Sequence, residues 1–586
     1  TLDGGTISGN TANSYGGGVY VDTPGTFIMS TGTISQNTAI FSSSYGGGGG
    51  VSSAGTFTMS GGTISRNTTD ASGGGVSASG TSATFTMGGG TISGNSAGWG
   101  GGGVHVYYGR FTMNDGTISE NTGTHFGGGV FITDGTATMN GGTISQNTTG
   151  GPGGGVYCRD TFTMNSGTIS ENTAGYNSRY GDGGGVYCGD TFTMNGGTIS
   201  KNIANGIGEG GGLCNASGTA TITGGEITGN TAGQGAGCYC SGSNSTTTFK
   251  GGRVSGNILS NAAGKGKGVY VATPNFILEG GGADLADGVY LSSNAYPIKL
   301  SRTIRQAGRR YNVELATPTV NSTNGFRVGD SVVIPEGTLE SAAPNLRYFA
   351  TDYEGAVLDR GTGNKAKNIV LKKIIFVDGV KGNDQNDGST PDLAYKTFAA
   401  AKKALGSDPG NIYICGKLTV SAGDNWSLGA DQSLRRYSGF AVAGKYSYTP
   451  YRGDMIEVTG GTLTLGGIAI QGRHDADQGF TADGSIIKVN GGNVTMGTGT
   501  TLENNTTTGN GGAVNIVSGT LTMNGGTIEN TQAAKGGAIY QGDKFLVGGA
   551  VSVEGGVYLA GGGNAATSKY IELTTTSGSA LSVDMA

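Results

Sequence analysis

The fold is decided by a stretch that recurs, with small variations, along the first half of the chain. Residues 153–172 read Gly-Gly-Gly-Val-Tyr-Cys-Arg-Asp-Thr-Phe-Thr-Met-Asn-Ser-Gly-Thr-Ile-Ser-Glu-Asn. Apolar residues occupy alternate positions within Val-Tyr-Cys, Phe-Thr-Met and Thr-Ile-Ser, which is the period of two expected of β-strands with one buried face. Glycine-rich or polar turns separate these segments, so each copy is predicted to hold three short strands.

The tripeptide Thr-Ile-Ser gives the period of the repeat. Its isoleucine stands at positions 7, 34, 64, 92, 118, 144, 169 and 199, and related tripeptides follow around Ile227 and Val254. Three strands every 25 to 30 residues predict a parallel β-solenoid, in which each strand pairs with its equivalent in the next coil about 4.8 Å away.

An asparagine follows the last residue of each tripeptide at a distance of two, and we expect these side chains to stack as a hydrogen-bonded ladder at a bend. The ladder residues are Asn10, Asn37, Asn67, Asn95, Asn121, Asn147, Asn172, Asn202, Asn230 and Asn257.

Shifts in composition predict four segments. Residues 1–300 form a first β-helix of about ten to eleven coils of 25–30 residues, and residues 301–373, where glycine falls and Arg and Lys rise, form a small β cap or linker domain. Residues 374–406 hold a start motif and a helix that covers the open end of a second β-helix, residues 407–586. That second β-helix is expected to stop where a further cap domain begins, as in a longer tandem array.

The helix is predicted over residues 392–405. It places Phe398, Ala401 and Leu405 on one face and has Gly406 as its stop signal. Exposed strand edges at the end of a solenoid need such a cover, because they otherwise pair with other chains.

Composition excludes several other classes of protein. Of 586 residues, 121 are glycine and only ten are proline, without a Gly-X-Y period, which excludes collagen. The chain has 35 basic and 40 acidic residues and a net charge of −5, so no electrostatic footprint for nucleic acid is present. Six cysteines are too few for a disulfide scaffold. Cys158, Cys188 and Cys240 are expected to be buried free thiols.

The alternation of Gly-Gly-Gly-Val or Gly-Gly-Ala-Ile with an apolar-x-x-Asn motif resembles the repeats of chlamydial polymorphic outer-membrane proteins and other autotransporter passengers. The opening at Phe376-Val-Asp-Gly, followed by Lys396-Thr-Phe, looks like the start of secreted pectin-lyase-like proteins. The resemblance implies two right-handed parallel β-helices in tandem, separated by a small β cap domain, in an extracellular or bacterial cell-surface protein that is often an adhesin.

One candidate binding face is an aromatic row beside Gly-Gly-Gly-Val, predicted to point outward. Exposed rings stack on sugars or pack against another chain, although aromatic neighbours also stabilise adjacent strands without any ligand. The row consists of Tyr20, His105, Phe131, Tyr157, Tyr187, Tyr239 and Tyr270.

A hydroxyl ladder is the second candidate face. A flat threonine lattice resembles ice-binding solenoids, although threonine is favoured on any solvated strand. The ladder consists of Thr6, Thr33, Thr63, Thr91, Thr117, Thr143, Thr168 and Thr198.

Two groups of acidic residues were weighed as chemical sites. Asp378, Asp384, Asn386 and Asp387 offer the hard oxygen ligands that suit Ca²⁺, with ordinary turn hydrogen bonding as the alternative. Asp134, Asp160 and Asp190 precede equivalent strands of successive coils and are the nearest approach to a carboxylate stack. Asp in a turn before a strand is, however, the ordinary Asx-turn solution, and this interpretation is favoured, so no catalytic residue is assigned.

We therefore expect a non-enzymatic stalk, adhesin or structural filament that binds glycans, cell-surface or matrix components, or copies of itself, with Ca²⁺ as the one cofactor considered. The alternatives are a polysaccharide lyase or hydrolase on the same fold and an ice-binding protein.

Overall fold

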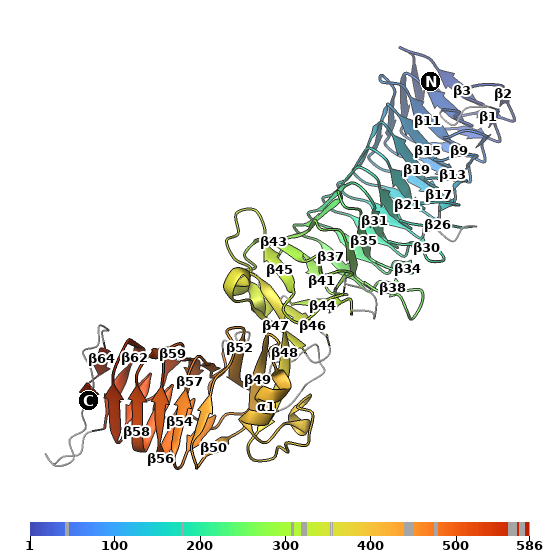
Figure 1. Ribbon diagram of the computed structural model, residues 1–586. Coiled ribbons are helices and arrows are strands. Elements are labelled where there is room, and N and C mark those ends of the chain that lie inside the picture. The colour runs from blue at the N-terminus through green and yellow to red at the C-terminus, as the bar shows by residue number, and fades with distance from the viewer. Residues whose placement is uncertain are drawn as a thin grey trace. The chain divides into compact units, whose positions relative to one another are not determined.

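The computed structural model describes residues 1–40, 46–176, 181–305, 310–317, 325–351, 353, 356–438, 449–473, 479–560, 571–573 and 581–584. The chain is all-β, with about 49% strand and 3% helix, and forms a parallel β-solenoid of about 19 turns. It divides into two compact units, residues 1–326 with 333–342 and residues 327–332 with 343–586. Within each unit the strands stack as successive rungs (Figure 1).

From Thr6 to Glu279 each coil of the first unit contains four strands and not the three that were predicted. In the coil quoted above they are β23 (Val156–Cys158), β24 (Thr161–Met164), β25 (Thr168–Ser170) and β26 (Thr173–Ala174). The fourth strand follows the ladder asparagine and has only two residues. A segment so short shows no alternation, which is why the pattern did not indicate it.

Equivalent strands pair in parallel along four ladders. The ladders start at β1 (Thr6–Ser8), β2 (Thr11–Ala12), β3 (Val19–Val21) and β4 (Thr26–Met29). The first three continue to β41 (Asp284–Leu285), β38 (Ile258–Leu259) and β44 (Tyr311–Leu315), in that order. The fourth continues through β43 (Ile298–Arg302) to β45 (Ser331–Pro335).

The core of the first unit is a set of in-register stacks. Phe57 and Phe85 stack with ring centroids 4.7 Å apart and planes inclined by 6°. Backbones approach so closely at the glycine turns that a side chain does not fit: a Cβ on Gly155 would lie 2.6 Å from the carbonyl oxygen of Gly185. The glycine content thus follows from the tight corners of the coil.

The predicted asparagine ladder is present and buried. The backbone N–H and Nδ2 of Asn95 donate to Oδ1 of Asn121 at 3.0 and 2.9 Å, and the same pattern repeats from coil to coil. At its C-terminal end the acceptor is a carboxylate, because Asn257 donates twice to Asp287 Oδ2, at 2.7 and 3.0 Å. Lys267 lies 3.4 Å from Asp287 Oδ1 and compensates its charge.

A second amide ladder lies on the surface and was not predicted. Asn114, Asn140, Asn165 and Asn195 are exposed and stand on successive coils. Each Nδ2 donates to Oδ1 of the preceding asparagine at 2.8 to 2.9 Å. The same hydrogen bond therefore occurs in the first unit both buried and in water.

The stretch predicted as a small β domain, residues 301–373, is shared between the two units. In the first unit, β43 (Ile298–Arg302) pairs in parallel with β40 (Phe276–Glu279) and continues the solenoid. In the second unit, β47 (Ala356–Arg360) and β48 (Ile369–Asp378) form an antiparallel pair. A separate cap domain is not among the units into which the described chain divides.

Shorter elements surround this pair in the second unit. They are η1 (Ala343–Tyr348), β46 (Phe349–Thr351), η2 (Gly363–Lys365) and η3 (Pro391–Leu393).

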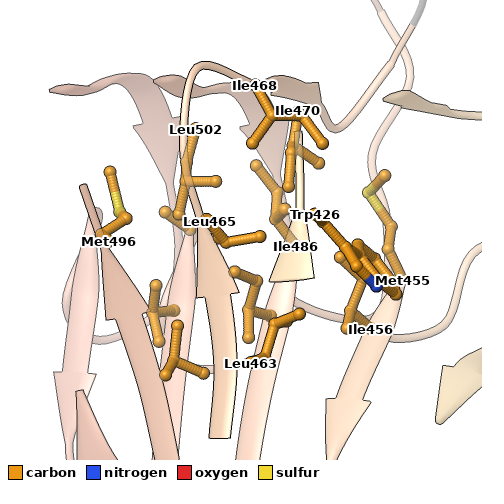
Figure 2. Close-up of a cluster of buried hydrophobic side chains, with 14 of the residues drawn as sticks. Trp426, Met455, Ile456, Leu463, Leu465, Ile468, Ile470, Ile486, Met496 and Leu502 are labelled. Carbon is orange, nitrogen blue, oxygen red and sulfur yellow. The ribbon is translucent and has the colours of Figure 1, made fainter. Parts of the chain in front are cut away.

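The predicted helix of the second unit is α1 (Phe398–Leu405). It begins six residues later than expected, because Thr397 is the N-cap and accepts a hydrogen bond from the backbone N–H of Ala400. Phe398, Ala401 and Leu405 are buried as predicted, and Phe398 stacks on Trp426 with centroids 4.3 Å apart. Figure 2 shows Trp426 among the aliphatic side chains of this core. No helix in the described ranges is long and apolar enough to span a bilayer.

The coils of the second unit are less regular than those of the first. One ladder contains β52 (Gln432–Arg436), β55 (Ala469–Gln471), β57 (Thr501–Thr506), β59 (Gly526–Gln532) and β62 (Val551–Leu559). The strands β56 (Ile487–Met496) and β58 (Val514–Met523) run across two ladders without a break. They pair with β53 (Ile456–Val458), β54 (Thr462–Leu465), β60 (Ile539–Gln541) and β61 (Lys544–Val547).

Candidate functional site: a charged cleft on the second unit

A row of glutamates follows one ladder of the second unit. Gln471, Glu503 and Glu529 are register partners on β55, β57 and β59. Glu554 continues the row, because it follows Val553 as Glu529 follows Ile528, and those two residues are partners. Leu502 and Ile528 are fully buried, so the alternation of the strand turns the glutamate side chains outward.

This row borders a cleft on the second unit with a volume of about 1400 Å³. Three cations and two aromatic rings accompany the three carboxylates. The charged, amide and aromatic residues of its lining are Arg360, Arg473, Phe480, Glu503, Asn504, Glu529, Asn530, Gln532, Lys535, Glu554 and Tyr558.

Contacts between neighbours hold several of these groups in place. The Nε2 of Gln471, a buried residue, donates to Glu503 Oε1 at 2.6 Å. Tyr558 stacks on Tyr540 with centroids 5.3 Å apart, and Lys535 Nζ lies 5.2 Å from the centroid of Tyr558. The aromatic and cationic sides of the cleft are therefore joined by a cation–π contact.

The arrangement suits hydrogen bonding to polyhydroxylated ligands. Glu503 and Glu529 are half-buried, whereas Glu554 and Lys535 are exposed. The charged groups of the cleft therefore differ in their exposure to solvent. Carboxylates accept hydrogen bonds from hydroxyl groups, guanidinium and ammonium groups donate them, and aromatic faces pack on apolar ring faces. Three acidic and three basic side chains give the cleft no strong preference for either sign of charge.

Sequence reasoning missed this row, although its signal is visible. Glu503 and Glu529 stand in Thr-Leu-Glu and Thr-Ile-Glu, where the first unit has Thr-Ile-Ser. A carboxylate replacing the same serine in successive coils predicts a charged stack at that position. Arg473, Phe480 and Lys535 lie outside the strands, so no periodicity indicated them.

The predicted aromatic row exists as one register row, but most of its rings are not exposed. Tyr20 is 50% exposed, whereas His105 (0%), Phe131 (2%) and Tyr239 (8%) are buried. Tyr157, Tyr187 and Tyr270 are half-buried, and burial raises the pKa of Tyr270 to about 12. This corrects the expectation that the whole row points into solvent.

Two rings of the row, those of Phe131 and Tyr157, are covered by a residue of the segment before Gly127. The Phe126 ring lies 5.7 Å from that of Phe131 and 4.8 Å from that of Tyr157. Phe131 is thus covered by a residue of its own coil, and Tyr157 by a residue of the preceding coil.

The predicted hydroxyl ladder is in register from Thr6 to Thr198. Thr6 is exposed and the other seven threonines are half-buried. Ice binding by this face stays a prediction.

The loop considered for Ca²⁺ uses its oxygens internally. Asp378 Oδ1 accepts from the backbone of Val380 and Lys381, both at 2.9 Å, and Asp384 Oδ1 accepts from Lys396 and Thr397. Asp387 accepts from Ser389, and Asn386 Nδ2 donates to the Ala394 carbonyl. In the described part of the chain no three His, Cys, Asp or Glu side chains are placed to hold a metal ion. The geometry matches the turn alternative, and Ca²⁺ binding stays a prediction.

Asp160 and Asp190 accept hydrogen bonds from the hydroxyls of Thr161 and Thr191, at 3.1 and 3.4 Å. The six cysteines are free and all except Cys415 are buried, which includes Cys158, Cys188 and Cys240, the three that were expected to be buried thiols. Burial raises the pKa of the Cys188 thiol to about 12, which disfavours the reactive thiolate.

Comparisons with known proteins gave no relative: no family model matches the chain, and no curated protein and no solved structure matches it.

Proposed function

We propose that the chain is a non-enzymatic extracellular β-solenoid of a bacterial cell surface, a stalk or adhesin that binds a glycan through the cleft of its second unit. The observation that carries the proposal is the meeting of Glu503, Glu529, Lys535 and Tyr558 around one cleft of about 1400 Å³. Right-handed coils and a tandem arrangement of β-helices with an intervening cap belong to the same proposal.

The chemistry of the cleft favours a polysaccharide over a protein or a polyanion. Its balanced charges do not select a polyanion, and its half-buried acids and aromatic rings match hydroxyl groups and apolar ring faces. The glutamates recur once per coil, about 4.8 Å apart along the ladder. A linear polymer running along the ladder would meet equivalent carboxylates in successive coils.

The test is a glycan array with the full chain, followed by calorimetric titration of the strongest neutral oligosaccharide. Glu529→Gln and Lys535→Ala should each weaken binding about tenfold, which corresponds to about 1.4 kcal/mol. Glu171→Gln is the matched control, since it removes one carboxylate from the first unit and leaves the cleft intact. Binding that survives both cleft variants, or an array without signal, would refute the proposal.

A polysaccharide hydrolase or lyase is the second candidate, favoured by one observation. Glu503 and Glu529 are register partners on adjacent strands, whose separation of about 4.8 Å is close to the roughly 5 to 5.5 Å between the carboxyl groups of retaining glycosidases. Release of reducing or unsaturated sugars from a polysaccharide panel, lost in both Glu503→Gln and Glu529→Gln, would replace the binding proposal by this one.

A further inference from the structure

A buried polar cluster lies at the start of the second unit, on the opposite face of β48 and β49 from the main core. Its members come from four neighbouring strands: Asp359 on β47, Lys372 on β48, Asn411 on β49, and Ser433 and Arg435 on β52. The strand β49 spans Gly410–Gly416. Asp359 and Asn411 are 0% exposed, Arg435 is 3% exposed, and Lys372 and Ser433 are 4% exposed. A lysine and a carboxamide are thus held together with a carboxylate in a nearly dry site.

One carboxylate oxygen contacts both the amine and the amide. Asp359 Oδ2 accepts a hydrogen bond from Asn411 Nδ2 at 2.9 Å and lies 4.0 Å from Lys372 Nζ. It also lies 2.7 Å from a guanidinium nitrogen of Arg435. The lysine therefore has a carboxylate at ion-pair distance, and the same oxygen is hydrogen-bonded to the nitrogen that would have to depart.

The carbonyl end of the same amide is polarised. Ser433 Oγ donates to Asn411 Oδ1 at 2.7 Å, and Arg435 Nε donates to Ser433 Oγ at 2.8 Å. A donor placed on an amide oxygen stabilises the negative charge that develops there when a nucleophile adds to the carbonyl carbon. The cluster thus supplies a nucleophile, an acceptor, a proton carrier and an oxyanion donor.

We propose that Lys372 and Asn411 form a covalent amide cross-link between their side chains. Asp359 takes a proton from the Lys372 ammonium, and the free amine adds to Cγ of Asn411. The resulting oxyanion is stabilised by the Ser433 hydroxyl. The Nζ–Cγ bond forms and the Cγ–Nδ2 bond breaks. Two protons leave Nζ in all, and Asp359 relays them to the departing nitrogen, which leaves as ammonium. No oxidant or cofactor is needed.

Burial gives the reaction a direction. A buried ammonium is costly to desolvate, and the neutral amide product removes that cation while the pair of Asp359 with Arg435 stays. The new bond would also close the segment that holds the start motif and α1, which restricts the unfolded chain as a disulfide does. The expected result is a covalently fixed entrance to the second solenoid.

The experiment is intact-mass spectrometry of the purified full chain, followed by peptide mapping. We expect the mass to fall short of the sequence mass by one ammonia, with one branched peptide pair containing Lys372 and Asn411. Lys372→Met and Asn411→Ala should each give the full mass calculated from the variant's sequence. Asp359→Asn should leave Lys372 and Asn411 unlinked. Lys373→Ala, which alters the neighbouring lysine that pairs with Asp408, should keep the cross-link.

Wild-type protein that is folded by circular dichroism and has its full sequence mass overturns the proposal, whether or not the variants fold. Loss of ammonia that maps to an imide at an Asn-Gly step, such as Asn140-Gly141, overturns it equally. A branched peptide that persists in Asp359→Asn would overturn the role given to Asp359.

Discussion

Asn121→Ala should be among the most destabilising single substitutions in the first unit. The carboxamide of Asn121 is buried and makes four hydrogen bonds. Its Oδ1 accepts from the backbone N–H and Nδ2 of Asn95, and its Nδ2 donates to the Ile92 carbonyl and to Asn147 Oδ1. Alanine removes all four at once.

The magnitude follows from which partners lose a hydrogen bond without gaining water. Asn147 Oδ1 still accepts from the backbone N–H of residue 121, and Asn95 Nδ2 still donates to the Ile64 carbonyl. The Asn95 N–H and the Ile92 carbonyl are left without these partners in a buried site. With about 1 to 3 kcal/mol for each of these two unsatisfied groups, the free energy of unfolding of the first unit should fall by about 2 to 6 kcal/mol.

The control is Asn140→Ala in the exposed ladder, where water replaces the lost partners. Its effect should stay below about 0.5 kcal/mol. Urea unfolding would be followed by Trp99 fluorescence in a Trp426→Phe background, which leaves the first unit with the single indole of the chain. Equal effects of the buried and exposed substitutions would refute the reasoning that burial determines the strength of the ladder.

Three further substitutions test the cores of the two units. Burial lowers the pKa of His105 to about 3. The unfolded chain takes up a proton below about pH 6.5 and the folded chain does not, so stability is lost as the pH falls from about 6.5 toward 3. His105→Phe should therefore remove about 2 kcal/mol of the difference in unfolding free energy between pH 7 and pH 5, measured by urea unfolding. An unchanged difference would contradict the lowered pKa of His105. Phe85→Ala, in the stack with Phe57 and Phe111, should cost about 3 to 5 kcal/mol in the same assay, whereas a cost below 1 kcal/mol would mean that the stack collapses freely. Arg436→Met removes the hydrogen bonds to the carbonyls of Gly472, Gly484 and Ser485 and should destabilise the second unit by about 3 kcal/mol. Urea unfolding followed by Trp426 fluorescence in a Trp99→Phe background would measure this effect. An unshifted unfolding midpoint would contradict it.

The fold could be predicted because one coil determines the next. Equivalent residues in a parallel ladder share one environment, so the recurrence of Ile92, Ile118 and Ile144 at a fixed position revealed both the pairing and the buried face. The burial of His105 could not be predicted in the same way. His105 lies between Ser77 and Phe131 in its register row and stacks on Phe131, and the residues at this row position differ from coil to coil.

The candidate site escaped prediction for a related physical reason. A row of identical residues on a solenoid gives every coil the same surface, so a site with a defined position requires coils that differ. Glu503 and Glu529 are periodic and readable from the repeat, whereas Arg473, Phe480 and Lys535 come from segments between strands. The ladder therefore supplies evenly spaced carboxylates, and the irregular segments supply two of the three cations and an aromatic wall of the cleft. Grafting Glu at Ser119 and Ser145 of the first unit should thus create the same carboxylate spacing without creating glycan binding, a result that calorimetric titration of the double variant would check. Measurable binding there would mean that the row alone is sufficient.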